Sequence, residues 1–402
     1  MSDQYRVLMA EFRSGVIWAE LPVSELQFTT ILNAPGSATF TLPLAGTPLV
    51  GLPFSALSPW RTLIFVQRGR QILWGGPLIT YRVDMEKEEL QLSCEGLWSY
   101  YRRRVINWHY LATKRDELVI ARELLMRFAD GQGARLDGQQ PDQRWWDLGA
   151  PYGNGVGALT FDMNARSGVL RDRTYWRYEW RSVGEAVEQL AAIRSNPFSP
   201  TPNIPGGFDF RIDHRWEGTK IRNDFNFLVP VLGQESGIVL EHRANCDVVN
   251  ISVDGTAMTT AATVTGAGEG HDQLVNWWYN RDLEEDPNRR IPRLYQVESH
   301  ANVTEIDTIN GYARKLISQG QTPITIPSVR LIPGLYPSVS DIRVGELVEV
   351  RAKTPNWPGL SGKYKVMQMS AKAGEGAEDV TLELCPAEVF TYVGTDDPQP
   401  GW

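Results

Sequence analysis

The chain has 402 residues, with 40 lysines and arginines against 48 aspartates and glutamates, which gives a formal net charge of −8. This length predicts two or three domains, and a composition with 42% hydrophobic residues is typical of a folded protein and excludes general disorder. The negative charge argues against a general binder of nucleic acid or anionic membranes, because such proteins need an excess of basic residues.

The three cysteines, Cys94, Cys246 and Cys385, are far apart and show no CxxC or Cys/His spacing. We therefore expect neither a disulfide framework nor a structural zinc site, and we expect each thiol to be buried. The first residues lack the pattern of a signal peptide, and no apolar run approaches the roughly 20 residues of a membrane span. We expect a chain that is made and folded in a cytoplasm and does not insert into a membrane.

Residues 1–96 are predicted to form a β domain. A hydrophobic strand over residues 63–66 is followed by a turn and by a longer strand over residues 72–83. The sequence Gly75-Gly76-Pro77 is expected to break or bulge this longer strand. Residues 90–94 alternate strictly between apolar and polar, as a half-buried strand does.

Residues 97–205 are predicted to form an α+β insert. Apolar residues recur at helical spacing after Thr113 and Asp116, and Gly131 supplies a stop signal. Ser182 and Glu185 have the spacing of a capping box at the start of a second helix. Four prolines between residues 196 and 207 indicate a linker.

Residues 206–270 and 330–393 are predicted to form a second β domain, into which residues 271–329 insert a small α/β domain. Asp254-Gly255 lies between two strand-like runs and predicts a hairpin. A helix is expected near residues 304–318 in the inserted domain. Residues 394–402 are expected to be a C-terminal tail.

Two distant segments share one layout: a short strand, a long strand and an alternating strand. The first covers residues 63–66, 72–83 and 90–94, and the second covers residues 347–350, 362–369 and 380–385. This similarity of pattern is explained by a duplication or by the general resemblance of antiparallel meanders, and the sequence leaves both open.

Catalytic and cofactor motifs are missing from the sequence. There is no HExxH and no GxSxG, and the Gly-rich sequences at residues 266–270 and 359–364 lack the spacing of nucleotide-binding loops. We therefore expect no catalytic residues, no cofactor and no metal.

One segment favours an interaction surface, because the insert is rich in tryptophan and arginine. The candidate residues are Arg102, Arg103, Arg104, Trp145, Trp146, Trp176, Tyr178 and Trp180. In a strand over residues 175–181, Trp176, Tyr178 and Trp180 would share one face. An exposed face of this kind could stack sugars or bases, whereas a buried one would be the core of a small domain, and we favour burial.

The β-rich domains without catalytic motifs indicate an assembly protein, and the chain resembles the baseplate hub or tail hub (minor tail) proteins of long-tailed bacteriophages that infect Gram-positive hosts. The motifs that carry the resemblance are Leu32-Asn33-Ala34-Pro35-Gly36 with Phe40-Thr41-Leu42-Pro43, then Pro59-Trp60-Arg61-Thr62 followed by residues 66–76, and finally Val344-Gly345-Glu346-Leu347-Val348 with Gly362-Lys363-Tyr364-Lys365-Val366. Their order spans most of the chain.

The resemblance implies a mainly β fold with two tail-tube-like antiparallel β-barrel or sandwich domains and two smaller α+β domains. It implies a non-enzymatic structural protein of the virion tail tip that forms a homotrimeric, pseudo-sixfold ring. The implied partners are the tail tube or distal tail protein, the tape measure protein and the tip or receptor-binding proteins. Genomic DNA would pass through the ring without specific binding, which suits an acidic chain.

Two alternatives use the Trp-rich segment instead. One is a carbohydrate-binding or glycan-cleaving module, and the other is a single-strand nucleic-acid binder, which the net charge disfavours.

Overall fold

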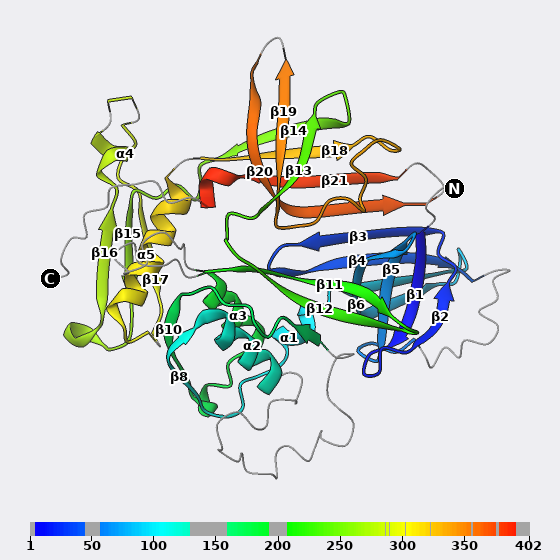
Figure 1. Cartoon of the computed structure of the whole chain (residues 1–402), viewed down its shortest axis with the longest axis horizontal. Coiled ribbons are helices and arrows are strands. Elements are labelled where there is room, and N and C mark those ends of the chain that lie inside the picture. Colours follow the sequence, from blue (N-terminus) through cyan, green and yellow to red (C-terminus); the bar gives the residue numbers. More distant parts are fainter. Residues whose placement is uncertain are drawn as a thin grey trace.

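The computed structural model describes residues 5–44, 57–128, 159–192 and 207–390, apart from residues 286, 289, 302, 322, 355–356 and 375–377. Most of this part is β structure, so the predicted fold class, mainly β with α+β inserts, is confirmed. Figure 1 shows two groups of long strands that lie against each other, a group of helices beneath them, and a smaller sheet with its own helix at one side.

The first β module lies within residues 5–95. Its described strands are β1 (Tyr5–Glu11), β2 (Ile17–Leu21), β3 (Glu25–Ile31), β4 (Ala34–Pro43), β5 (Thr62–Arg68), β6 (Gln71–Asp84) and β7 (Glu89–Glu95). They pair antiparallel in the order β2-β1-β5-β6-β7-β4-β3. Buried and exposed residues alternate along β7, as predicted, because successive side chains of a strand point to opposite faces.

β6 is one strand that changes partner at the Gly75-Gly76-Pro77 sequence. Residues 71–77 pair with β5, and residues 78–84 pair with β7. A Cβ atom on Gly76 would lie 1.9 Å from the carbonyl oxygen of Glu95, so only glycine permits this close approach of two backbones. The strand therefore crosses from one partner to the other without interruption.

The helical insert follows β7. Its described elements are α1 (Trp98–Arg102), β8 (Tyr110–Asp116), α2 (Glu117–Phe128), β9 (Leu159–Phe161), β10 (Leu170–Tyr175) and α3 (Val183–Ala192). The two predicted helices are confirmed as α2 and α3. The Ser182 hydroxyl accepts a hydrogen bond from the N–H of Glu185 at 3.3 Å, as the capping-box spacing predicted.

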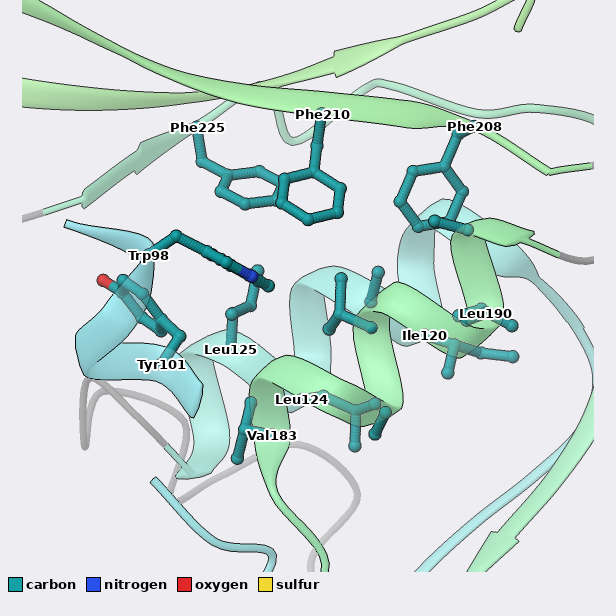
Figure 2. Packing of buried hydrophobic residues seen from close by; sticks show 14 of the residues in the cluster. Trp98, Tyr101, Ile120, Leu124, Leu125, Val183, Leu190, Phe208, Phe210 and Phe225 are labelled. Carbon is teal, nitrogen blue, oxygen red and sulfur yellow. The ribbon is translucent and has the colours of Figure 1, made fainter. Parts of the chain in front are cut away.

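A long hairpin covers these helices and consists of β11 (Asp209–Glu217) and β12 (Lys220–Leu228). The rings of Phe210 and Phe225 are stacked with their centroids 5.4 Å apart, and both contact the indole of Trp98 (Figure 2). β12 also pairs with β9, whereas β11 meets β6 through a single residue pair. Residues 209–228 therefore pack with the helical insert, whereas the sequence analysis assigned them to the second β domain.

The second β module comprises β13 (Gln234–Glu241), β14 (Cys246–Asp254), β18 (Ile324–Leu331), β19 (Glu346–Thr354), β20 (Trp357–Ala373) and β21 (Asp379–Pro386). β14 pairs with β18, so the hairpin predicted at Asp254-Gly255 is wrong. The Asp254 carboxylate instead accepts hydrogen bonds from the N–H and hydroxyl of Thr256 at 2.8 and 2.6 Å. This side-chain turn directs the chain out of the sheet.

The small α/β unit contains β15 (Ala261–Thr265), β16 (Val275–Tyr279), α4 (Arg281–Glu285), β17 (Tyr295–Ser299) and α5 (Ile306–Gly320). The helix predicted near residues 304–318 is confirmed as α5, which lies against this sheet (Figure 1). β15 pairs with β16 and β17 and not with the second β module, to which the sequence analysis assigned it. The inserted unit therefore begins before residue 271.

The buried apolar residues form two clusters. One fills the space within and between the two β modules and includes Phe28, Phe40, Val329 and Val366. The other joins the helical insert, the β11–β12 hairpin and the small α/β unit. All three cysteines are free and buried, as predicted. Within the described residues, no helix is long and apolar enough to cross a membrane.

Candidate assembly interfaces

Each arginine of the run at residues 102–104 contacts another part of the same chain. The Nε of Arg102 lies 2.7 Å from Oε1 of Glu188, the Arg103 guanidinium lies over the ring of Trp60, and Arg104 donates to the carbonyl oxygen of Phe128. The three side chains therefore point to different partners and hold α1 in place.

The aromatic run after β10 is a turn and not a strand. β10 ends at Tyr175, which is buried, and a short 3-10 turn follows over Arg177–Glu179. Trp176, Tyr178 and Trp180 are 38%, 70% and 59% exposed. The expected strand and the favoured burial are both wrong here, because Tyr175 alone enters the core and the chain then turns away.

Two of these aromatic residues lie together at the surface. The rings of Trp176 and Tyr178 are nearly parallel, with their centroids 6.3 Å apart, and His109 meets Trp176 edge-on at 5.2 Å. We call Trp176, Tyr178 and His109 the aromatic patch. Trp145 and Trp146 lie outside the described residues, so the structure does not place them beside it.

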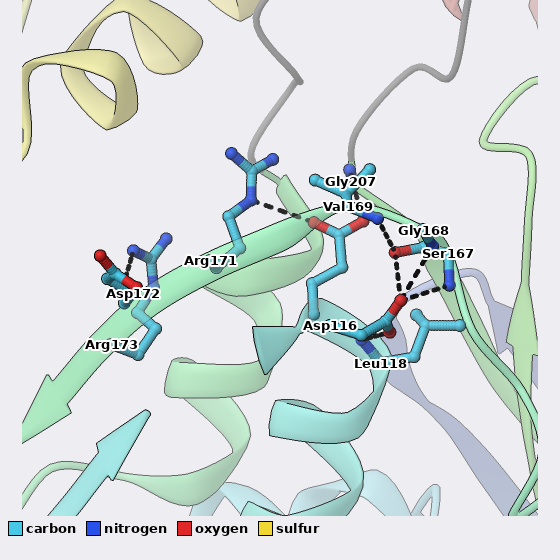
Figure 3. A network of polar contacts seen from close by, with 10 residues as sticks. Asp116, Leu118, Ser167, Gly168, Val169, Arg171, Asp172, Arg173 and Gly207 are labelled. Carbon is cyan, nitrogen blue, oxygen red and sulfur yellow. Dashed lines mark hydrogen bonds and ion pairs between the residues drawn. The ribbon is translucent and has the colours of Figure 1, made fainter. Parts of the chain in front are cut away.

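Two buried carboxylates lie at the start of α2, Asp116 directly before the helix and Glu117 as its first residue, and both have internal partners. Asp116 accepts the N–H of Gly168 at 2.8 Å, and Glu117 pairs with Arg171 at 3.2 Å and accepts the N–H of Gly207 at 3.1 Å (Figure 3). Burial raises the pKa of the Glu117 carboxyl. These contacts tie α2 to β10 and to the start of β11, which is a structural role. Among the described residues, no group of three or more His, Cys, Asp or Glu side chains could hold a metal ion.

Apart from β2, the strands of the first β module correspond one to one with those of the second. The first pairs its strands in the order β1-β5-β6-β7-β4-β3, and the second in the order β13-β19-β20-β21-β18-β14. When the strands of each order are ranked by their place in the chain, both sheets have the order first, fourth, fifth, sixth, third, second. One pairing differs in direction, since β1 is antiparallel to β5 whereas β13 is parallel to β19.

A bulge lies at the same place in both modules. The β6–β7 register runs from Asp84–Glu89 to Thr80–Ser93 and then skips a residue on β6 before Leu78–Cys94. The β20–β21 register runs from Lys372–Asp379 to Gln368–Glu383 and then skips a residue on β20 before Val366–Leu384. The skipped residues are Ile79 and Met367. Position 78 therefore corresponds to 366, and positions 80–84 correspond to 368–372, which favours duplication over a chance likeness of two meanders.

The modules are joined edge to edge within the chain. Residues 368–373 of β20 pair antiparallel with residues 26–31 of β3, in the order Gln368–Ile31 to Ala373–Leu26. The hydroxyl groups of Thr29 and Ser370 lie 3.0 Å apart across this junction. The side chains of Phe28, Met369 and Ala371 are buried on its core face. One continuous sheet thus passes from the second module into the first.

A cavity of about 400 Å³ lies beside this junction, between β6, β11 and the segment that includes Arg343. Two of the arginines that line it, Arg211 and Arg343, pair with Asp213 at 3.0 and 3.5 Å. Arg211 also donates to the carbonyl oxygen of Val344 at 2.9 Å. These contacts fasten β11 to the second β module.

No protein-family model matches the chain, and no curated protein matches it. Solved structures do. The 43 kDa tail protein of a prophage from Shewanella oneidensis has a TM-score of 0.58 at 8% identity and aligns over 96% of this chain and 99% of its own. A tail protein from Neisseria meningitidis has a TM-score of 0.55 at 12% identity over 96% and 98%.

A prophage tail protein from Listeria monocytogenes has a TM-score of 0.50 at 9% identity and aligns over 94% of both chains. At these identities the likeness establishes the fold. The chain has the fold of phage tail proteins along nearly its whole length, and the resemblance inferred from the sequence motifs is confirmed at that level.

Proposed function

We propose that the chain is the tail hub of a long-tailed phage, a non-catalytic structural protein of the virion. Three copies form a ring at the tail tip, which links the tail tube or distal tail ring to the tip and the receptor-binding apparatus. The observation that carries this proposal is the presence of two β modules with the same strand order and the same bulge in one chain.

The internal junction supplies the geometric reason. β20 of one module pairs with β3 of the other, and these strands hold different positions in their modules, so the contact is head to tail. Repeated head-to-tail contacts either close into a ring or continue as a filament. Three chains with two modules each give six similar positions, which would match a threefold tip to a sixfold tube.

The ring would line the channel through which DNA leaves. The net charge of −8 supports passage without adhesion, because like charge keeps the phosphate backbone from binding. The tail tube or distal tail protein, the tape measure protein and the tip or receptor-binding proteins would contact its faces and its outer units.

The aromatic patch supports the second candidate function, recognition of a carbohydrate. Exposed parallel rings such as those of Trp176 and Tyr178 present apolar faces on which a sugar can stack. Binding of cell-wall glycan to a monomer, lost in Trp176→Ala, would favour this function over the ring.

Native mass spectrometry of the purified chain tests the proposal. We expect a species of three chains that persists at low micromolar concentration. A strictly monomeric protein, or a dimer related by a twofold axis, would contradict it.

A further inference from the structure

We infer that neighbouring copies of the chain join through β14 of one copy and the C-terminal half of β6 of the next. This inference rests on the proposed ring and identifies the surface that closes it. The occupant of each edge is a second copy of this chain, and the pairing repeats the internal β20–β3 junction.

The strand correspondence defines the partners. β6 occupies in the first module the place that β20 occupies in the second, and β14 occupies the place of β3. The β20–β3 junction is made inside the chain. The equivalent junction would join β6 to β14, and among the described strands these two do not pair with each other. A neighbouring copy can supply the missing half on each side.

Both edges are open in the described part of the chain. Among the described strands, β14 pairs only with β18, and residues 80–84 of β6 pair only with β7. Open strand edges carry unpaired backbone groups that readily pair with another chain, and proteins usually cover or charge them. Here neither edge is covered by another described strand.

The register follows from the bulges. Because positions 80–84 correspond to 368–372, the internal pairs Met369–Thr30, Ser370–Thr29 and Ala371–Phe28 have counterparts between copies. β18 holds in the second module the place that β4 holds in the first. Because β14 pairs with β18 as β3 pairs with β4, residue 251 corresponds to residue 28. The expected pairs are Tyr81–Val253, Arg82–Ser252 and Val83–Ile251, with Thr80–Asp254 and Asp84–Asn250 at the ends.

The side chains agree with this register on both faces. On the face that continues the core, the four residues Tyr81, Val83, Ile251 and Val253 are all apolar, and Tyr81 and Val253 are 43% and 64% exposed in the single chain. Of their four internal counterparts, Met369, Ala371 and Phe28 are buried and Thr30 is half-buried. Pairing would therefore bury apolar area that the single chain leaves in water.

The opposite face is polar throughout: Thr80, Arg82, Asp84, Asn250, Ser252 and Asp254. In the expected register, Arg82 lies diagonally across from Asp254, within reach of an ion pair between copies. A shift by one residue would place polar side chains of one strand among the apolar side chains of the other. The sequence of the two edges thus favours one register.

Cysteine crosslinking tests the inference. Directly opposed residues of antiparallel strands have Cα atoms roughly 4.5–5.5 Å apart, which a disulfide can bridge. In the double variant Arg82→Cys/Ser252→Cys, oxidation should give covalent dimers and trimers on a non-reducing gel. Each single variant should give none, because β6 meets β14 and not itself. The three native cysteines are buried and serve as a common background.

The control is Arg82→Cys/Val253→Cys, whose side chains would point to opposite faces and should not crosslink. Efficient crosslinking of this control, or of Ser252→Cys alone, would overturn the inferred register. A native mass of three chains without crosslinking of Arg82→Cys/Ser252→Cys would overturn this inference and leave the proposed ring intact. A monomer without crosslinks would overturn both.

A second variant tests the same surface without a crosslinking reaction. Val253→Asp should convert the trimer to monomers, since it places a charge on the apolar face opposite Tyr81. Val297→Asp is the matched control, because Val297 is 68% exposed on β17 and lies outside the inferred junction. Loss of the trimer in both variants, or in neither, would contradict the inference.

Discussion

Asp209 on β11 and Lys365 on β20 form a buried ion pair between the strand that leaves the helical insert and the second β module. The same carboxylate accepts a hydrogen bond from Nδ2 of Asn33 at 2.6 Å, and Asn33 lies between β3 and β4 of the first module. One carboxylate is thus bonded to both modules. We expect it to fix their relative orientation, on which the curvature of the proposed ring depends.

Lys365→Met should lower the free energy of unfolding by about 3–5 kcal/mol, because it leaves the Asp209 carboxylate buried without its cation. Urea denaturation measures the change. The control is Lys363→Ala on the same strand as Lys365. It removes an exposed ion pair with Glu235 of β13 and should cost less than about 1 kcal/mol. Equal effects of the two variants would show that burial of the pair does not matter.

Gly76→Ala should disrupt the first module, because the new Cβ would lie 1.9 Å from the backbone oxygen of Glu95. Gly362→Ala on β20 is the control, because its new Cβ would make only an ordinary contact, at 3.8 Å, with a ring carbon of Tyr364. The thermal midpoint should fall strongly in the first variant and stay near the wild-type value in the second. Normal stability of Gly76→Ala would refute the close approach of β6 to the end of β7.

Glu284 should make the stability of the small α/β unit depend on pH. Oε2 of Glu284 lies 2.8 Å from Nη2 of Arg293, and Oε1 accepts from the Thr260 hydroxyl at 3.1 Å. These contacts lower the pKa of Glu284, with the hydrogen bond from Arg293 as the largest cause. The stabilisation is therefore complete above the unfolded value of about 4.3 and is lost as the pH falls through the lower native pKa.

Glu284→Gln should therefore reduce stability at neutral pH by at most about 1 kcal/mol, and the difference from wild type should vanish in acid. Denaturation series at several pH values measure it. If the difference in stability between Glu284→Gln and wild type persists unchanged in acid, the charge of Glu284 does not cause it.

Tyr178→Ala should change the free energy of unfolding by no more than about 0.5 kcal/mol, because Tyr178 is 70% exposed. It should also leave the number of chains in the assembly unchanged. Tyr175→Ala, three residues earlier, removes a ring that is 4% exposed and should cost about 3 kcal/mol or more. Thermal denaturation and native mass spectrometry check both. If Tyr178→Ala dissociates the ring, the aromatic patch belongs to the contact between copies.

Local patterns predicted most of the single elements. The alternation of β7 and the Ser182 cap of α3 depend only on neighbouring residues, so the sequence contains all the information needed. The partner of β14 does not follow from local pattern, since its Asp-Gly turn leads out of the sheet and β18 lies about 70 residues further along the chain. The packing of residues 209–228 against the helical insert depends on distant contacts in the same way.

The candidate surface was predicted less well. The alternation over residues 175–181 resembles a strand, but Trp180 adopts a left-handed conformation with φ 48°. Glycine is the usual sequence signal for this conformation, and residue 180 is not a glycine. The internal partners of Arg102, Arg103 and Arg104 could not be predicted, because Glu188, Trp60 and Phe128 are distant from them in the sequence. The open edges of β6 and β14 escaped notice because an edge is defined by the strand that is missing beside it, and only the paired topology reveals that.

Images of the assembled protein along its axis test the central claim most directly. The account predicts a closed ring of three chains with six similar lobes around a central channel, alternately joined within and between chains. A monomer, an open filament, or a ring whose lobes do not form three pairs would contradict it.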